Sequence, residues 1–371
     1  MIKVCHMTSA HKSTDTRIFH KQCVSLAKSG YDVCLVTLGE SYESNGVKII
    51  GVPKVIGGRL IRMTQGTKSI YKKALEINAD IYHIHDPELL PYALKLKKKK
   101  KKVIFDSHEY YYLLISHKYY LPSFMRKLAA NIYDIYETRV CKKIDAVVFP
   151  CLVNGKDVFA NRSNKSIFID NTPILNELYN KYDVHHAKIN RAIVYIGDLT
   201  YERGITQLVK ASFIAEATLV LCGVYNPQSY FDELKDLKEY ECVDYKGFVN
   251  RHDVCKILNE CLVGICTILC VGQYKQVDNL ATKVYEYMSM GLPVIISNGS
   301  YARKVNEKYE CFILVNPEDV DEIACAINYL LEHTEIAKKM GQNGRRAILE
   351  EFNWGIEEKK LLELYGEIKS I

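Results

Sequence analysis

The sequence lacks several signals that would place it in other protein classes. Its longest apolar run, Leu262–Val271, is about half of what spans a bilayer, and the N-terminus shows no signal-peptide pattern. Its 13 cysteines have no paired metal spacing and form no disulfide framework, which favours a reducing cytoplasm. The fingerprint G-x-G-x-x-G is absent from the first strand–helix turn, which disfavours an NAD-binding domain.

The charge is unevenly distributed over the 371 residues. Residues 1–185 carry a net charge of +12 and residues 186–371 a net charge of −6, which suggests one face meeting an anionic surface. Six consecutive lysines, Lys97–Lys102, are either a solvated helix end or an attachment to anionic lipid. Nucleic-acid binding is not expected, because no aromatic residues that could stack on bases are interleaved with these lysines. We therefore expect a cytoplasmic protein, with peripheral attachment to the inner face of the membrane as an option.

Apolar strand-like runs alternate with helical patterns along the first half. Such alternation predicts an α/β fold with a parallel sheet covered on both faces. Helices are expected at Ile18–Ser29, Pro87–Leu96 and Leu121–Lys143. The expected strands are Val4–Thr8, Val33–Leu38, Val47–Val52, Ile81–His85, Val103–Ser107, Ala146–Pro150 and Ile167–Ile169.

A second series of strands follows the polar linker Asn176–Arg191. The predicted domains are residues 1–185, residues 186–352 and a C-terminal helix, 353–371, that crosses back to the first domain. Two such sheets facing a central cleft place a ligand at the carboxyl ends of their strands. The expected strands are Ile193–Gly197, Thr218–Gly223, Val243–Val249, Val263–Leu269, Val294–Ser297 and Cys311–Val315, and the last helices are Asp319–His333, Glu335–Phe352 and Ile356–Ile368.

The stretch from Asp278 to Asn298 predicts a phosphate site. A helix is expected at Thr282–Met290, ending at Gly291 in a left-handed conformation, with Pro293 preventing its continuation. The first amides of a helix have no partner inside it, so they bind anions. The amides near Thr282, Lys283 and Val284 would point at such a ligand, and the Lys283 ammonium would add charge.

Glu286 lies one turn further into this helix, among apolar residues where an unpaired carboxylate would be costly. There it could accept hydrogen bonds from paired ribose hydroxyls. The residues E-Y-M-S-M-G-L-P-V-I, starting at Glu286, resemble the nucleotide-sugar motif of the retaining glycosyltransferases of family four, which adopt the GT-B fold. The resemblance extends over nearly the whole chain, including F-N-W before the last helix.

The resemblance implies donor-site roles in the second half. In the family two acidic residues bracket the donor, and the second, here Glu286, contacts the ribose. Asp278 stands where the first is usually Glu, and Asn279 could share its donor-sugar role. The turn that begins at Gly197 has Asp198 where the family has an arginine for the diphosphate, so Arg203, in place of the family's lysine, should carry more of that task.

In the first half, His108 follows a strand where the family places a histidine facing the donor sugar and the acceptor. Glu109 is also assigned to the acceptor side. Arg17 could reach phosphate or acceptor, and a cap role is equally open for Asp15. Asp86 is explained structurally, as an N-cap with Pro87 at the first helical position.

The resemblance implies an enzyme that moves a hexosyl or N-acetylhexosaminyl group from a nucleoside diphosphate sugar to a hydroxyl group, with retention of the anomeric configuration. A UDP-sugar is expected as donor in preference to a GDP-sugar. The acceptor would be a glycan or a lipid-linked glycan in surface polysaccharide assembly. His108, Asp278 and Arg203 are the expected catalytic residues, and neither a cofactor nor a metal is expected. Two rivals remain: a nucleotide-sugar epimerase and a non-catalytic sugar-nucleotide-binding protein.

Overall fold

The computed structural model describes residues 1–117, 122–178 and 191–370. The chain divides into two compact units: unit 1 is Met1–Asn171 with Gly355–Ile371, and unit 2 is Thr172–Trp354. The predicted boundary between residues 185 and 186 lies outside the described residues. Within the part of the chain that is described, no helix has the length and apolar character needed to cross a membrane.

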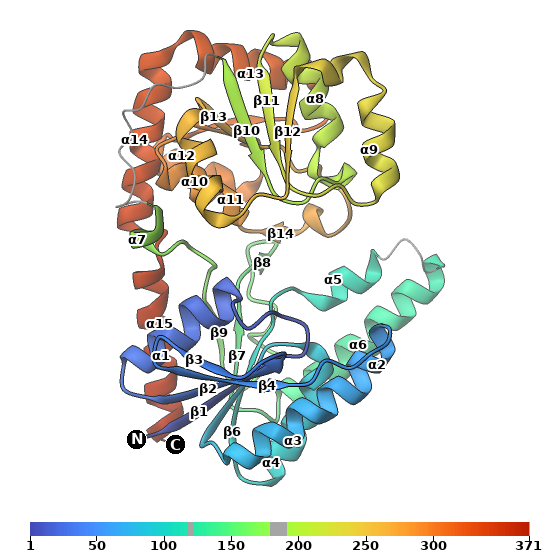
Figure 1. The fold of residues 1–371 in the computed structure, drawn as a ribbon, viewed down its shortest axis with the longest axis vertical. Helices are drawn as coiled ribbons and strands as arrows, with labels where there is room; N and C mark the ends of the chain where they lie inside the picture. The colour runs from blue at the N-terminus through green and yellow to red at the C-terminus, as the bar shows by residue number, and fades with distance from the viewer. Residues whose placement is uncertain (118–121, 179–190, 371) are drawn as a thin grey trace. The chain divides into compact units, whose positions relative to one another are not determined.

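Unit 1 is built on one sheet with the strand order β3-β4-β2-β1-β5-β6-β7-β9 (Figure 1). Strand β3 pairs antiparallel with β4, and the other neighbours are parallel, as the alternation of strands and helices predicts. Strand β8 (Leu152–Val153) follows β7. The strands of the sheet are β1 (Lys3–Met7), β2 (Asp32–Leu38), β3 (Tyr42–Ser44), β4 (Val47–Val52), β5 (Ile81–Ile84), β6 (Lys102–Asp106), β7 (Ala146–Phe149) and β9 (Ser166–Phe168).

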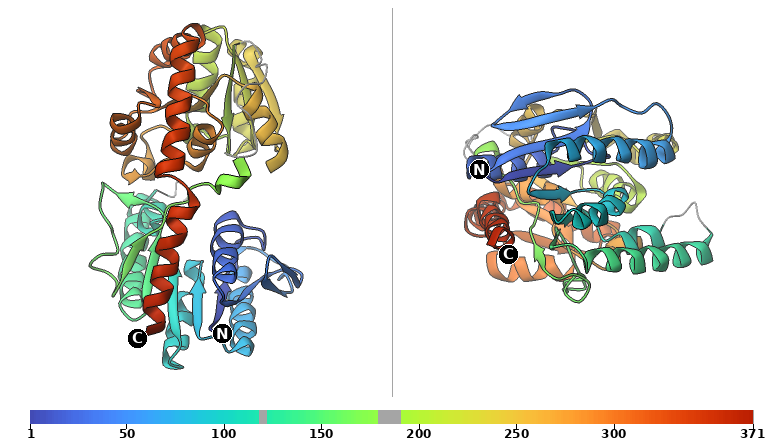
Figure 2. Two further views of the ribbon diagram at one scale, coloured as in Figure 1. Left: turned by 90° about the vertical axis from the view of Figure 1, so that its left-hand side faces the viewer. Right: turned by 90° about the horizontal axis from the view of Figure 1, so that it is seen from below.

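Helices cover both faces of this sheet. On one face α3, α4 and α6 close a hydrophobic core, and on the other lie η1, α1 and α15. Helix α15 ends where β1 begins, at the same end of unit 1 (Figure 2). The helices are η1 (Thr16–Cys23), α1 (Val24–Lys28), α2 (Arg59–Ile61), η2 (Arg62–Gly66), α3 (Thr67–Ile77), η3 (Pro87–Leu89), α4 (Leu90–Lys98), α5 (Tyr111–Ser116), α6 (Ser123–Cys141) and α15 (Trp354–Ser370).

Unit 2 holds a six-stranded parallel sheet in the order β12-β11-β10-β13-β15-β16. Its strands are β10 (Ala192–Ile196), β11 (Thr218–Cys222), β12 (Val243–Gly247), β13 (Val263–Cys266), β15 (Val294–Ser297) and β16 (Phe312–Val315). The short strand β14 (Val277–Asp278) precedes α11.

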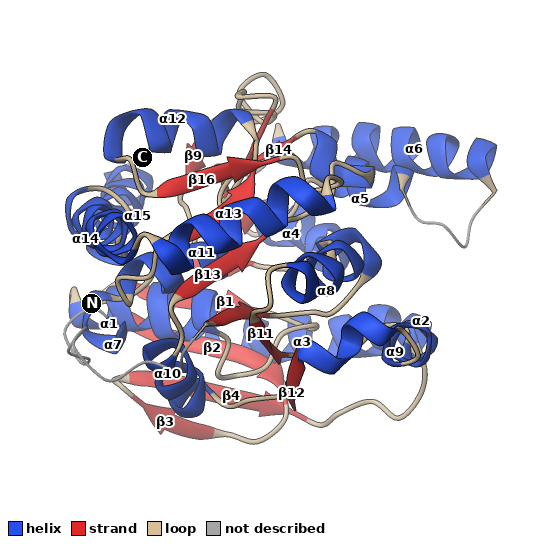
Figure 3. Cartoon of the chain, turned by 90° about the horizontal axis from the view of Figure 1, so that it is seen from above, coloured by secondary structure: helices blue, strands red, loops and turns tan. Residues whose placement is uncertain are grey.

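Alternate residues of these strands point to two separate cores. One core includes α10, α11, α12 and α14, and the other includes α8, α9 and α13, so helices flank the strands on both faces (Figure 3). The helices are α7 (Leu175–Leu178), η4 (Tyr201–Arg203), α8 (Ile205–Ile214), α9 (Gln228–Lys235), η5 (Lys238–Cys242), α10 (Arg251–Glu260), η6 (Gly272–Lys275), α11 (Thr282–Ser289), α12 (Ser300–Tyr309), α13 (Val320–Glu332) and α14 (Thr334–Glu350).

Helix α11 confirms the helix predicted from Thr282. Gly291, just after it, has a φ of 71°, a left-handed conformation that favours glycine, and β15 begins three residues later at Val294. The helix packs closely on β13 because Gly264 has no side chain: a Cβ there would lie 2.5 Å from the ring of Tyr287. This close packing fixes the start of α11 beside the carboxyl end of β10, where the Tyr287 hydroxyl bonds to the Ile196 amide at 3.0 Å.

Candidate functional site

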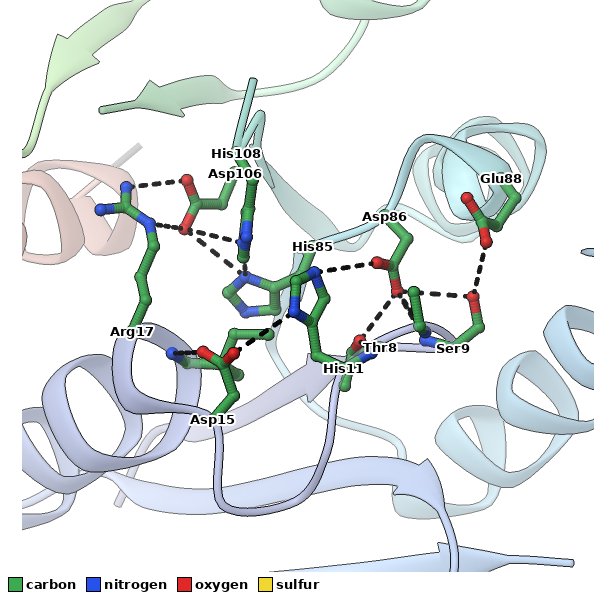
Figure 4. A network of polar contacts seen from close by, with 12 residues as sticks. Thr8, Ser9, His11, Asp15, Arg17, His85, Asp86, Glu88, Asp106 and His108 are labelled. Atoms are coloured by element: carbon green, nitrogen blue, oxygen red, sulfur yellow. Dashed lines mark hydrogen bonds and ion pairs between the residues drawn. The ribbon is translucent and has the colours of Figure 1, made fainter. Parts of the chain in front are cut away.

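Polar residues gather where three neighbouring strands of unit 1 end. Strands β1, β5 and β6 are adjacent and parallel, so their carboxyl ends meet at one edge of the sheet. Thr8 follows β1, His85 follows β5, and His108 comes two residues after β6. Figure 4 shows these side chains in one connected network.

A buried ion pair between Arg17 and Asp106 lies at the base of this network. The Arg17 guanidinium donates to both carboxylate oxygens of Asp106, each at 2.9 Å, and to the Ile169 carbonyl at 3.0 Å. Burial alone would raise the pKa of Asp106, but Arg17 and then His108 lower it to well below its ordinary value. Arg17 is only 5% exposed. The structure therefore gives Arg17 an internal role; its predicted reach toward phosphate or acceptor stays a prediction.

Asp86 occupies the N-cap position of η3 with Pro87 at the first helical position, as predicted, but its side chain forms no capping hydrogen bond there. Its carboxylate instead accepts from the Thr8 hydroxyl at 2.8 Å and from the amides of Ser9 and Ala10. Three donors in the loop after β1 satisfy the buried carboxylate better than a single amide of its own helix would.

Asp15 is a helix cap, one of the two alternatives considered for the first loop. Its Oδ1 accepts from the Ile18 amide at 2.9 Å. His11, which sequence reasoning missed, lies 3.3 Å from Asp15 and 3.5 Å from Asp86 through its two ring nitrogens. Burial opposes the charge on His11, but the bond to Asp15 and then the charge of Asp86 raise its pKa above the ordinary value. His11 therefore links the first loop to the end of β5.

His108 lies at the open side of the network. Its side chain is 14% exposed, its Nε2 lies 3.6 Å from Asp106 Oδ2, and its ring centroid lies 4.6 Å from that of His11. Burial lowers the pKa of His108, so the neutral imidazole is the main form near pH 7. Glu109 is exposed to solvent. The histidine that the sequence singled out therefore lies beside Asp106, with a small part of its ring accessible.

Behind His108, a chain of hydrogen bonds runs inward to the C-terminal helix. His108 Nε2 lies 3.2 Å from His85 Nδ1, and His85 Nε2 lies 2.8 Å from His6 Nδ1. The Tyr365 hydroxyl on α15 lies 3.4 Å from His6 Nε2 and 2.8 Å from His83 Nδ1. All three inner histidines are fully buried, and burial lowers their pKa values, that of His85 to about 3, so they are neutral.

Two opposite placements of protons satisfy the contacts in this chain, and we choose the one that leaves no buried donor of His83 without a partner. In this placement the donors are as follows. His83 donates from Nδ1 to the Tyr365 oxygen, Tyr365 donates to His6 Nε2, His6 donates from Nδ1 to His85 Nε2, and His85 donates from Nδ1 to His108. The Nε2 of His83, which has no partner, is then a bare lone pair and no buried donor is left unsatisfied. His108 therefore accepts at Nε2 and keeps its own proton on Nδ1.

Two groups in this network could hold a metal ion: His6 with His83 and His85, and His85 with Asp106 and His108. In each group the ligand atoms lie within 4.8 Å of one another. The rings of the first group stack with interplanar angles from 16° to 34°, so a shared ion would require them to turn and would break the His6–His85 bond. The expectation that no metal is needed stays a prediction.

In unit 2, two cations gather beside the turn after β10. Lys283 Nζ lies 3.7 Å from the ring centroid of Tyr195, and the Arg203 guanidinium lies 4.9 Å from that of Tyr274. Burial, and then the charge of Arg203, lower the pKa of Lys283 to about 8, although a nearby thiol opposes them. Among the described residues neither cation forms an ion pair with a carboxylate. Two close cations that lack an acidic partner favour an anionic ligand.

Gly197 makes room for this arrangement. Its φ of 130° lies in the region that favours glycine, and a Cβ there would lie 2.7 Å from Lys283 Nζ. Asp198, the residue in place of the family's arginine, is exposed, and its carbonyl accepts from the Tyr195 hydroxyl at 3.0 Å. The turn thus brings together three of the residues predicted to bind the donor, Gly197, Arg203 and Lys283.

The start of α11 differs from the prediction at one amide. The Val284 amide donates to the Ala281 carbonyl at 2.8 Å, so it is not free to point at a ligand, and that part of the prediction is wrong. The first turn has tightened into an i to i−3 bond, as helix ends often do. Thr282 is exposed and Lys283 half-buried, so the positions around their amides remain near the surface.

Glu286 is buried, 8% exposed, and has a partner that sequence reasoning missed. Its Oε1 forms an ion pair with Nη1 of Arg251, whose other terminal nitrogen lies 3.5 Å from Glu177. Asp278 bonds instead to the Ser300 hydroxyl at 2.5 Å, and Asn279 beside it is half-buried. The oxygens of the Glu286 side chain can accept hydrogen bonds from hydroxyl groups, as the predicted contact with the ribose requires.

Two family models match the chain, on separate stretches. Residues 182–347 match Glycosyl transferases group 1, and residues 16–154 match Glycosyltransferase Family 4. An uncharacterized glycosyltransferase from Methanocaldococcus jannaschii is 25% identical over 365 residues, 92% of this chain and 90% of that protein. MMP alpha-(1->4)-mannosyltransferase from Mycolicibacterium hassiacum is 37% identical over 78 residues, which span 21% of this chain and only 19% of that relative.

Solved structures share the fold over the full chain. Sucrose-phosphate synthase from Thermosynechococcus elongatus matches with a TM-score of 0.77 at 16% identity, covering 100% of both chains. Anabaena Alr3699/HepE in complex with UDP-glucose matches with a TM-score of 0.70 at 14% identity, covering 99% of this chain and 100% of the other. The predicted GT-B fold is confirmed. With its two parallel-sheet units and its matches to both family models, the chain belongs to the group 1 glycosyltransferases of GT-B type.

Proposed function

We propose that this glycosyltransferase moves a hexosyl or N-acetylhexosaminyl group from a UDP-sugar to a hydroxyl of a glycan or lipid-linked acceptor, with retention at the anomeric carbon. The pair of cations Arg203 and Lys283, beside Gly197 and without carboxylate partners among the described residues, carries the proposal. A nucleoside diphosphate supplies the negative charge that this pair lacks. The preference for UDP draws support from the Anabaena structure of the same fold, which holds UDP-glucose.

Each residue has a role that its surroundings suit. Arg203 and Lys283 bind the diphosphate and stabilise the charge that develops on it as the bond to the sugar breaks. Glu286 accepts hydrogen bonds from the ribose, and Asp278 with Asn279 contacts the donor sugar. His108, neutral and with its proton on Nδ1, donates to an oxygen of the sugar, while Glu109 serves the acceptor side. The two cations supply the charge stabilisation that a metal ion supplies in other transferases.

A thermal-shift screen against nucleotides and nucleotide sugars tests the proposal. A ligand that binds the folded state alone stabilises it by RT ln(1 + [L]/Kd), about 2.7 kcal/mol at a hundredfold excess over Kd. UDP and UDP-sugars should raise the melting temperature more than GDP-sugars, and Arg203→Ala should remove the shift. Turnover of a donor without any acceptor would indicate an epimerase instead. Binding without turnover across a broad acceptor panel would indicate a non-catalytic binding protein.

Affinity for UDP should fall as pH rises through about 8, where Lys283 in the unliganded protein loses its proton. Between that value and the ordinary lysine pKa of about 10.4, the unfolded chain binds more protons than the folded one, so the free energy of unfolding rises with pH there. Calorimetric titration with UDP across this range measures the first effect, and Lys283→Met is the matched control. A pH dependence that is unchanged in Lys283→Met would exclude Lys283 as its source.

A further inference from the structure

Helix α6 of unit 1 exposes a row of large apolar side chains. They lie at spacings of three and four residues, so they share one side of the helix. Figures 1 and 3 show α6 extending outward beyond the sheet of unit 1. The exposed residues are Phe124 (75%), Met125 (44%), Leu128 (58%), Ile132 (60%) and Ile135 (52%).

The opposite side of α6 is fixed in unit 1. Ala130 and Val140 are buried there, and both carboxylates of the helix pair with one arginine. Arg162 lies 2.9 Å from Asp134 Oδ1 and 2.8 Å from Glu137 Oε2. The helix therefore cannot turn its apolar row inward without breaking these contacts, and both of its carboxylates already pair with Arg162 within unit 1.

Positive charges surround the end of the apolar row. Exposed cations lie on the last turn of α6 and directly after it, and Lys127 is exposed nearer its start. The end of α4 adds more, because Lys97 and Lys102 lie 2.7 Å and 3.8 Å from Asp145, close after α6 in the chain. The exposed cations of this region are Lys98, Lys99, Lys100, Arg139, Lys142 and Lys143.

We propose that α6 docks on an anionic lipid bilayer, with its apolar row in the boundary between headgroups and acyl chains. Helix α6 has an exposed apolar row flanked by cations, and its acidic residues pair with Arg162 inside unit 1. These are the features of a helix that lies in a membrane interface. A second copy of this chain fits the surface less well, since a two-fold contact between two such rows would bring their cations together. The lysine run contributes through Lys98–Lys100, because Lys97 and Lys102 are engaged with Asp145.

The test uses vesicles and does not require nucleotide or transfer, so its result is independent of the proposed function. Phe124→Trp places a fluorescent probe on the row; the chain's one natural tryptophan, Trp354, is 5% exposed and gives a constant background. Vesicles rich in phosphatidylglycerol should shift the probe's emission to shorter wavelength, and phosphatidylcholine vesicles should not. Binding should weaken, but not vanish, as salt is raised.

Sedimentation with the same anionic vesicles identifies the responsible surface. The double variant Leu128→Gln, Ile132→Gln should bind at least tenfold more weakly, and the control Leu349→Gln, an apolar residue 51% exposed on α14, should bind like the original protein. Replacing Lys98, Lys99 and Lys100 with Gln should also weaken vesicle binding. It should not increase the loss of binding that the Leu128→Gln, Ile132→Gln variant causes. Vesicle binding that is absent, or that the double variant leaves unchanged, would overturn the proposal. So would sedimentation velocity showing a dimer that the double variant dissociates, because the row would then bind a second copy.

Discussion

Replacing Arg17 with methionine is expected to lower the free energy of unfolding of unit 1 by about 3–5 kcal/mol, because it leaves the fully buried Asp106 carboxylate without its cation. The loss should shrink as pH falls. Arg17 helps to keep the pKa of Asp106 low, and this stabilisation disappears once the carboxyl group is protonated. Urea unfolding followed by circular dichroism measures the change, and hydrogen exchange in β1 and β6 assigns it to unit 1.

The exposed pair of Lys48 and Asp32 supplies the control for this experiment. Its nitrogen and oxygen lie 3.2 Å apart, but the lysine side chain is 56% exposed, so Lys48→Met should change stability by less than about 1 kcal/mol. If Arg17→Met and Lys48→Met cost the same, the buried network is not what holds the edge of the sheet together.

The second large effect is expected at His108. His108→Ala should reduce the rate of sugar transfer by about 10²–10³-fold, the usual cost of removing one donor that stabilises a transition state, and leave affinity for UDP within a few-fold. UDP affinity should survive because the residues proposed to bind it belong to unit 2, whereas His108 belongs to unit 1. A transfer assay beside calorimetric titration separates the two quantities.

Two amide variants test which nitrogen of His108 acts. The hydrogen-bond chain from Tyr365 assigns the proton to Nδ1. An asparagine side chain places its NH₂ near the position of Nδ1, and a glutamine places it near Nε2, so His108→Asn should keep more transfer activity than His108→Gln. The reverse order of transfer activity would contradict the assigned direction of the chain.

Much of the fold could be predicted because local pattern and tertiary structure agree in it. Buried strands such as β2 and β15 read directly as apolar runs, and Gly291 and Pro293 mark the end of α11 by backbone preference alone. The first helix was less predictable in detail. Its sequence pattern predicts an ordinary helix from Ile18, but the segment Thr16–Cys23 is π-helical, a local winding that apolar spacing does not encode.

Site residues that belong to a short sequence motif could be predicted. Contacts between residues far apart in the sequence could not. Lys283 and Gly197 were identified from their turns, but nothing in the sequence pairs Arg251 with Glu286, 35 residues apart. Asp86 was assigned to its own helix for the same reason. The histidines on β1 and β5 could have been found, since His83 and His85 alternate and must share a face of the sheet.

The most direct test of the account is the affinity of UDP for three variants, measured by calorimetry. Arg203→Ala and Glu286→Gln should each weaken binding about ten- to a hundredfold, the usual cost of losing a charged hydrogen-bond partner. Arg251→Gln breaks the same ion pair but keeps the Glu286 carboxylate, so it should bind within a few-fold of the original protein. The account would be contradicted if Arg203→Ala and Glu286→Gln left UDP binding intact while His108→Ala abolished it. The donor would then bind elsewhere.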